Sequence, residues 1–107
     1  MYDIENLPDA IDIGYTGEKD FRTVEVDMTR WLEDMYDGTP AIVFKRPGVA
    51  AYKPVTTFTD GILTWTVQDT DLGTSEVLGF AQFEMKDTDR ARKSPIIKVW
   101  IHRGLTR

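Results

Sequence analysis

Histidine and cysteine, two residue types that commonly carry acid–base and nucleophilic chemistry, are scarce in this chain. His102 is the only histidine, and it lies between Ile101 and Arg103 on a segment that alternates like a strand. A lone histidine acts as a general base only when a carboxylate from elsewhere in the chain orients it. The chain has no cysteine, which excludes a thiolate nucleophile, a disulfide and a thiolate metal site. We therefore predict no catalytic residues and no enzyme activity.

Two acidic clusters resemble metal-binding loops only in part. Asp69, Asp71 and Glu76 have the beginning of a calcium-loop spacing, but a third oxygen ligand and the distant bidentate glutamate are missing. Asp87 and Asp89 form a weaker match, and turns built from small acidic residues explain both clusters. The glycines fit no phosphate-binding loop, because no strand–loop–helix unit follows them. We expect no metal, no cofactor and no small-molecule substrate.

The charge of the chain is unevenly distributed. Residues 1–85 hold 6 Lys or Arg and 16 Asp or Glu, whereas residues 86–107 hold 7 and 2. An acidic body argues against nucleic acid as a partner. A basic last strand on such a body favours packing of copies, or of neighbouring proteins, with opposite charges meeting. The alternative interpretation is an unevenly charged, solvated surface.

Length and composition indicate one folded domain. The chain has 107 residues, of which 41% are hydrophobic and 29% charged, a normal balance for a globular protein. No apolar run approaches the roughly 20 residues that cross a bilayer, and the N-terminus lacks signal-peptide features. We expect no membrane partner and a protein made and folded in a cytoplasm. Residues 1–9 are predicted to be a flexible lead-in, and residues 10–107 a single domain.

Period-two alternation of apolar residues predicts about seven short strands separated by turns. The stretch from Asp60 to Met85 holds two such runs, and we interpret it as the core hairpin, followed across residues 69–78 by a crossing loop that could hold one helical turn. Pro54 marks the strand predicted over residues 51–58 as an edge strand or a broken one. The inward residues predicted for the two central runs are Leu63, Trp65, Val67, Ala81, Phe83 and Met85.

Residues 29–36 form the only other helix-like piece, with Trp31, Leu32, Met35 and Tyr36 on one face, and Trp31 is expected to close the end of the sheets. The predicted fold class is therefore all-β: an antiparallel β-sandwich, immunoglobulin-like or similar, of about seven strands with one short helical segment.

The last strand carries the most informative aromatic residue. Burial of Ile97, Val99 and Ile101 would leave Trp100 on the opposite face. An exposed tryptophan beside a cation is typical of an interface anchor or of a platform on which a sugar stacks, and Tyr52 could serve such a platform too. The alternative is that a short element of the same chain covers it. The possible interface residues are Trp100, Lys98, His102 and Phe80, the last facing outward from its own strand.

Several ordered motifs extend over nearly the whole chain. They include K-R-P-G at residues 45–48, G-F-A-Q at 79–82 and K-S at 93–94, each next to a predicted strand. In this order they resemble the small N-terminal β domains of phage tail and baseplate proteins from viruses and prophages of Gram-positive bacteria. The nearest family is the N-terminal domain of the baseplate upper protein.

The resemblance implies a non-enzymatic virion structural protein. It implies a domain that docks through contacts with other tail or baseplate proteins or with further copies of itself, located in the phage tail and made in the host cytoplasm. Because the shared motifs mark the fold, no functional residues carry over. Two other classes stay open: a carbohydrate-binding β-sandwich module, and a small hydrolase that uses acidic residues, for which no residue pair stands out.

Overall fold

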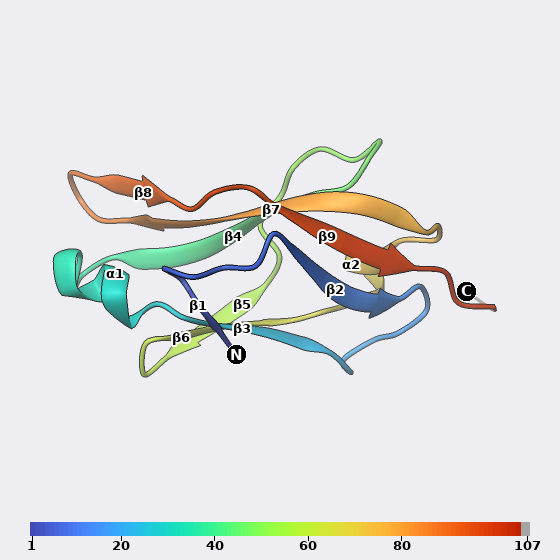
Figure 1. Cartoon of the computed structure of the whole chain (residues 1–107), viewed down its shortest axis with the longest axis horizontal. Coiled ribbons are helices and arrows are strands. Elements are labelled where there is room, and N and C mark those ends of the chain that lie inside the picture. The colour runs from blue at the N-terminus through green and yellow to red at the C-terminus, as the bar shows by residue number, and fades with distance from the viewer. Residues whose placement is uncertain (106–107) are drawn as a thin grey trace.

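The computed structural model describes residues 1–105, which form nine strands and two short helices (Figure 1). Their order is β1 (Tyr2–Asp3), β2 (Ala10–Tyr15), β3 (Thr23–Asp27), α1 (Thr29–Asp34), β4 (Thr39–Lys45), β5 (Thr56–Thr59), β6 (Ile62–Thr66), α2 (Asp69–Leu72), β7 (Val77–Lys86), β8 (Ala91–Lys93) and β9 (Ile97–His102).

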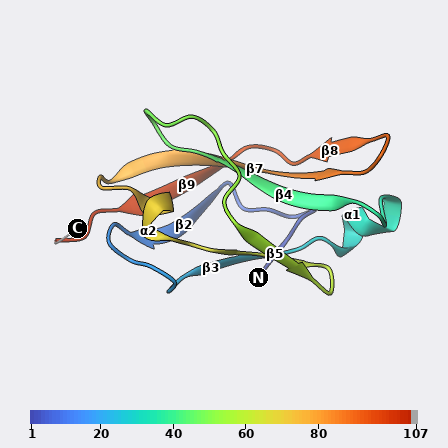
Figure 2. The same cartoon turned by 180° about the vertical axis from the view of Figure 1, so that it is seen from behind.

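The strands form two sheets around one core. The four-stranded sheet has the order β1-β3-β6-β5, and the five-stranded sheet has the order β2-β9-β7-β4 with β8 paired to β7. Figures 1 and 2 show the strands running along the length of the molecule, with α1 at one end. The predicted all-β class is confirmed. So are the inward residues of the two central runs, which all belong to the shared core: Leu63, Trp65, Val67, Ala81, Phe83 and Met85.

The strand count and pairing differ from the prediction. Residues 1–105 form nine strands rather than about seven, because β1 and β8 are short pieces that alternation does not reveal. The helical turn allowed for the crossing loop is present as α2, in addition to the predicted helical segment α1. The pairs β1–β3 and β2–β9 are parallel, so the sheets are not purely antiparallel. Each of these pairs joins strands that are not consecutive in the chain, so no tight turn forces them to run in opposite directions.

The stretch from Asp60 to Met85 is not a hairpin, which corrects the prediction. β6 pairs with β3 and β5 in the four-stranded sheet, whereas β7 pairs with β4, β8 and β9 in the five-stranded sheet. Both runs do bury one row of side chains, but they bury it from opposite sides of the core. The long connection that holds α2 permits this crossing, since only a short loop would oblige the two strands to pair.

The hairpin is instead formed by the start of this stretch and the strand that precedes it. β5 and β6 pair directly through Asp60 and Gly61, whose φ angles are 53° and 79°. Positive φ at both central residues is the geometry of the type I′ turn, which Asp-Gly favours. The predicted break at Pro54 is also confirmed, since Tyr52 bridges to Phe44 of the five-stranded sheet while β5 belongs to the other sheet.

The segment 1–9 is tied to the body, although we expected a flexible lead-in. β1 pairs with β3, and the Ile4 amide donates to the Asp27 carbonyl at 3.1 Å. The side chain of Ile4 is only 3% exposed, and Tyr2 packs against the core. Tyr2 and Ile4 thus supply an apolar pair that anchors a short terminal strand, which is the condition for an ordered terminus.

Tyr15 does not share the buried face of Ile11 and Ile13, although strict alternation along β2 would place it there. Those two isoleucines are buried, but Tyr15 is 47% exposed. The pairing of β2 with β9 shifts register between Asp12 and Tyr15, around Gly14 with its φ of 111°. Only glycine adopts this angle without strain, and such an irregularity turns the following side chain to the other face.

The helix α1 closes one end of the sheets. Trp31 and Met35 are buried as predicted, whereas Tyr36 is 80% exposed and does not join the apolar face. The Asp27 carboxylate accepts a hydrogen bond from the Thr29 amide at 2.9 Å. Hydrogen bonding with Thr29 lowers the pKa of Asp27 below its ordinary value. The helix ends before Tyr36, so that side chain projects from the following turn.

The buried carboxylate of Asp71 fixes the segment that connects one sheet to the other. Asp71 lies in α2, is 4% exposed, and accepts hydrogen bonds from the Tyr52 hydroxyl, from Trp65 Nε1 at 3.0 Å and from the Gln68 amide at 2.9 Å. Burial, and then the bond to Asp71, raise the pKa of Tyr52 far above its ordinary value. Asp71 thus joins α2 to β6 and to the segment beside β4. It has a structural role rather than that of a calcium ligand.

Replacing Asp71 tests this role. Asp71→Ala removes the acceptor for buried donors, so we expect the free energy of unfolding to fall by about 2–4 kcal/mol. The matched control is Asp69→Ala in the same helix, whose carboxylate bonds only the neighbouring Thr70 amide, and this change should cost less than about 1 kcal/mol. Urea denaturation measures both. Equal losses for the two variants would contradict the structural role of Asp71.

Candidate functional site

The outer face of the five-stranded sheet carries large apolar side chains. In β7 and β9 the inward residues fill the core, so period-two alternation turns the residues between them outward. Phe80 and Trp100 are 43% and 44% exposed, and Ile96, just before β9, is 66% exposed. The exposure predicted for Trp100 and Phe80 is therefore confirmed, and no element of residues 1–105 covers either side chain fully.

Strand register brings these residues together. Phe80 lies opposite Lys98, and Leu78 lies opposite Trp100. Phe80 is also opposite Lys45 of β4, so one row across the sheet places an aromatic ring between two lysines. An open hollow of about 390 Å³ lies beside it, lined by Val43, Lys45, Phe80, Ala81, Gln82 and Ile96. We call the outward residues Val43, Leu78, Phe80, Ile96 and Trp100 the apolar patch.

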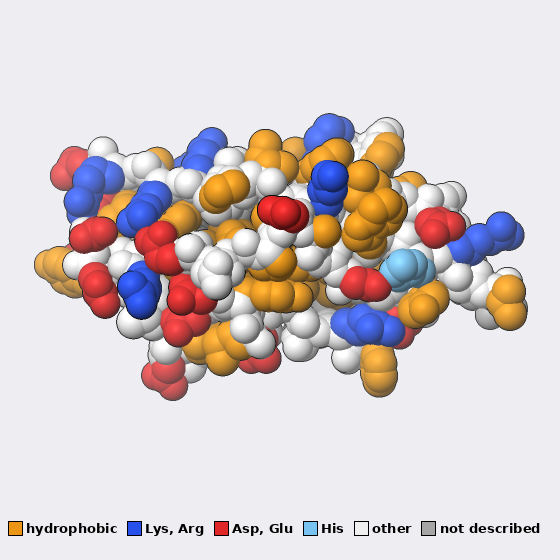
Figure 3. All heavy atoms as spheres, in the orientation of Figure 1, with side chains coloured by type: hydrophobic (Ala, Val, Ile, Leu, Met, Phe, Trp, Pro, Cys, Tyr) orange, Lys and Arg blue, Asp and Glu red, His pale blue; other side chains and the backbone are white. Residues whose placement is uncertain are grey.

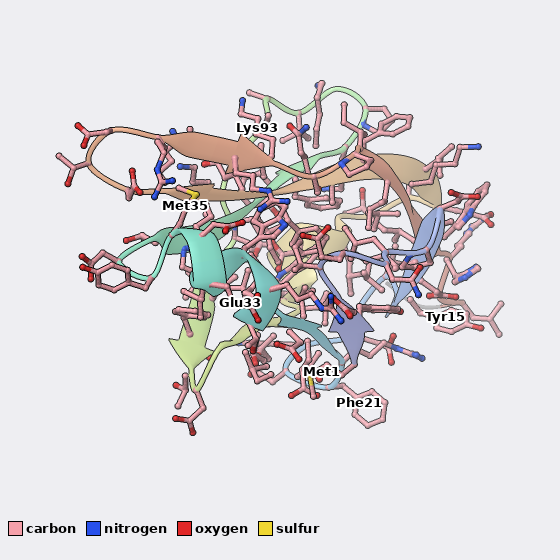
Figure 4. All side chains as sticks on the ribbon, turned by 60° about the vertical axis from the view of Figure 1, so that its left-hand side comes forward. Met1, Tyr15, Phe21, Glu33, Met35 and Lys93 are labelled. Atoms are coloured by element: carbon pink, nitrogen blue, oxygen red, sulfur yellow. The ribbon has the colours of Figure 1, made fainter. Side chains whose placement is uncertain are left out.

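A polar cluster borders the apolar patch at the end of β9. His102 Nε2 lies 2.5 Å from Asp12 Oδ2, and the rings of His102 and Tyr15 are 5.2 Å apart. Arg22 lies 5.7 Å from the centre of the Tyr15 ring and bonds Glu18 at 3.0 Å. The Tyr15 amide, and then Arg22, lower the pKa of Glu18. Figure 3 shows hydrophobic side chains gathered beside the single histidine, and Figure 4 shows Tyr15 projecting from the surface.

Lysines surround a buried carboxylate toward the other end of this face. Glu84 occupies an outward position of β7, yet its side chain is only 7% exposed. Lys53 Nζ lies 2.9 Å from Glu84 Oε1, and Lys86 Nζ lies 3.8 Å from the same atom. The hydrogen bond from Lys53, and then the charges of Lys53, Lys86 and Lys93, lower the pKa of Glu84. These lysines therefore leave the carboxylate little free charge to offer a partner.

The four residues proposed from the sequence all lie on this face. Phe80, Lys98 and Trp100 are neighbours at its centre, and His102 stands at its border. Four neighbours were missed, Val43, Lys45, Leu78 and Ile96. Alternation with the buried Ile42 and Phe44 could have revealed the first two. Tyr52, considered as a sugar platform, is partly buried and bonded to Asp71, so it offers no free ring face at this site.

Asp12 supplies the distant carboxylate that would orient His102, and the two side chains are 54% and 35% exposed. In residues 1–105 no group of three or more His, Asp or Glu side chains could hold a metal ion. Neither helix of the described chain is long and apolar enough to cross a membrane.

No protein-family model matches the chain, and no curated protein matches it. Two features of the chain bear on its function. One is the set of motifs at residues 45–48, 79–82 and 93–94, and the other is the arrangement of the apolar patch and its lysines.

The pairing of Glu84 with Lys53 predicts a pH dependence. Because folding depresses the pKa of Glu84, its contribution to stability is present above the unfolded-state value of about 4.3 and is lost as pH falls through the folded value. We expect wild type to exceed Glu84→Gln in free energy of unfolding at neutral pH, and the difference to shrink toward pH 3. Urea denaturation at a series of pH values measures this.

Lys53→Met serves as the companion variant. It removes the main cause of the depressed pKa, so its difference from wild type should shrink over the same pH range. A difference that stays constant from neutral pH to pH 3 in both variants would show that the Glu84–Lys53 pair does not stabilise the fold.

Proposed function

We propose that this protein is a non-enzymatic structural component of a phage tail or baseplate, and that it docks on its neighbours through the outer face of the five-stranded sheet. The observation that carries the proposal is the apolar patch, with two exposed aromatic side chains bordered by lysines. Contiguous exposed apolar surface rimmed by polar residues is a mark of an interaction site.

The position of the aromatic side chains suits an anchoring role. Phe80 and Trp100 lie on β7 and β9, which both have neighbours on each side within the sheet. Their backbones are therefore fixed before any partner arrives, and ordering them on binding costs little entropy. Aromatic residues at the centre of an interface, surrounded by polar residues, commonly provide most of its binding energy.

The motif resemblance supports the same class of protein. Lys45 from K-R-P-G, Phe80 from G-F-A-Q and Lys93 from K-S all come from strands of the five-stranded sheet. The partners we propose are other tail or baseplate proteins or further copies of this chain, within a virion assembled in the host cytoplasm. This location follows from the resemblance alone.

We further propose that the fold is immunoglobulin-like. If β1, β3, β6 and β5 are strands A, B, E and D, then β9, β7 and β4 are strands G, F and C. The two groups then match the two sheets of the immunoglobulin arrangement. β2 occupies the edge beside β9, and the parallel pairing of β1 with β3 departs from the usual antiparallel pairing of A with B.

A carbohydrate-binding module is the second candidate, favoured by one observation. Asp12 lies opposite Trp100 in the sheet and pairs with His102, so polar groups stand next to an exposed indole ring. Sugar sites combine a stacking ring with hydrogen-bonding groups of this kind. The lysines on both sides of Phe80 have no clear role in such a site, whereas they suit a docking surface.

A complementation experiment tests the proposed function. A prophage lacking this gene is complemented with wild type, Trp100→Ala or Tyr36→Ala, and mass spectrometry counts the copies in purified particles. Wild type and Tyr36→Ala should be present at several copies per particle, because Tyr36 is an exposed aromatic outside the apolar patch. Loss of a central anchor costs about 2 kcal/mol or more, so Trp100→Ala should be depleted at least about tenfold.

Two results would contradict the proposal. Wild-type protein that is abundant in the lysate and absent from particles would remove the tail assignment. A change of tryptophan emission on adding host cell-wall oligosaccharides would then support the second candidate, since Trp100 is the exposed one of the three tryptophans. Incorporation of Trp100→Ala at the wild-type level would show that the apolar patch is not the docking surface.

A further inference from the structure

The two sheets present opposite charges to solvent. The outward positions of the four-stranded sheet include Asp3, Glu25 and Asp27, and its strands contain no lysine or arginine. The other outward positions of this face are uncharged and carry small or branched side chains. They are Thr23, Thr57, Thr59, Ile62, Thr64 and Thr66.

The five-stranded sheet presents cations around its apolar patch. Its strands place four lysines on the outer face, and Lys53 stands beside them at Glu84. The two outward carboxylates are both engaged, Asp12 with His102 and Glu84 with Lys53. The net charge of this face is therefore positive. The four strand lysines are Lys45, Lys86, Lys93 and Lys98.

Each face has one charged side chain near its centre. Glu25 lies opposite Thr64 in the middle of the four-stranded sheet, and Lys98 lies opposite Phe80. Within residues 1–105 neither side chain forms a salt bridge. Asp3 and Asp27, by contrast, accept hydrogen bonds from nearby backbone amides. Glu25 and Lys98 are thus the charges most available to a partner.

We propose that the occupant of the apolar patch is a second copy of this chain, which presents the outer face of its four-stranded sheet. The inference rests on the proposed docking role of the patch and names its partner. Phe80 and Trp100 of one copy would pack on the threonine methyl groups and Ile62 of the next, and Lys98 would meet Glu25. A pair of opposite charges near the centre of two such surfaces sets their register.

The alternative pairing of two five-stranded faces is disfavoured by charge. In such a symmetric dimer the outer face of one five-stranded sheet meets the same face of the partner copy. The lysines around one apolar patch would then meet the lysines around the other. The proposed contact joins two different faces instead. Every copy then has one face of each kind to offer, and the contact repeats to form a ring or a stack.

The dimensions of the molecule allow such a contact. The chain measures 45 × 25 × 21 Å, and the strands of both sheets run along the long axis (Figures 1 and 2). A face of this length has room for the roughly 800 Å² that each partner buries in a standard interface.

Reciprocal charge reversal tests the proposal. Glu25→Lys places like charges on the two faces of the proposed contact, and so does Lys98→Glu. Sedimentation velocity over a range of concentrations should show wild type associating, with the dissociation constant raised at least about tenfold in each variant alone. An equimolar mixture of the two variants should associate again, because each contact between unlike copies then joins one lysine to one glutamate.

Matched controls carry the same charge changes elsewhere. Glu33 is exposed on α1, as Figure 4 shows, and Lys19 is exposed in the loop after β2. Glu33→Lys and Lys19→Glu alter the net charge as the test variants do, yet both should associate like wild type. Urea denaturation of each variant establishes that it folds.

The outcomes separate this inference from the proposed function. A wild-type protein that stays monomeric up to its solubility limit overturns the inference, as does a mixture of Glu25→Lys and Lys98→Glu that fails to associate. Neither result affects docking on other tail proteins, which the particle content of Trp100→Ala decides. Association of Trp100→Ala at the wild-type level would overturn the role of the apolar patch in self-association.

Discussion

The crossing between the two sheets depends on the buried carboxylate of Asp71. It accepts hydrogen bonds from Trp65 of β6, from Tyr52 beside β4 and from the backbone at the start of α2. A buried acceptor with several donors fixes one arrangement, because any other leaves polar groups unpaired. This arrangement sends β6 and β7 to opposite sides of the core. The inward row of β7 is therefore covered by the other sheet, and its alternate row, with Phe80, faces solvent.

The outer face follows from this placement. Once β7 and β9 are neighbours, Phe80 stands next to Lys98 and Leu78 next to Trp100. Each of these side chains is unremarkable by itself, but together they form an apolar surface with cations at its border. The opposite sheet has a threonine-rich outer face with carboxylates, and its strands contain no lysine or arginine. One small fold thus offers two faces of unlike chemistry, as the proposed contact between copies requires.

Local patterns predicted the local features of this fold well. Alternation identified the inward residues Leu63, Trp65 and Val67 and the outward position of Trp100, because a strand turns successive side chains to opposite faces wherever it pairs. Pairing itself is not local, and the supposed hairpin between Asp60 and Met85 proved to be two strands in different sheets.

Residues whose role depends on distant neighbours were missed for the same reason. Asp71 resembles any acidic turn residue until Tyr52 and Trp65 are placed around it, and Tyr15 turns outward only through the irregularity at Gly14. The part played by Lys45 depends on the register that sets it opposite Phe80.

We propose that a partner covers the outer face of the five-stranded sheet in the assembled particle. Lysine acetylation of purified particles and of the isolated protein, followed by mass spectrometry, measures whether this face is covered. In particles, Lys45 and Lys98 should be strongly protected, whereas Lys19, in an exposed loop, should react as it does in the isolated protein. Equal reactivity of Lys45 and Lys98 in both samples would contradict the account.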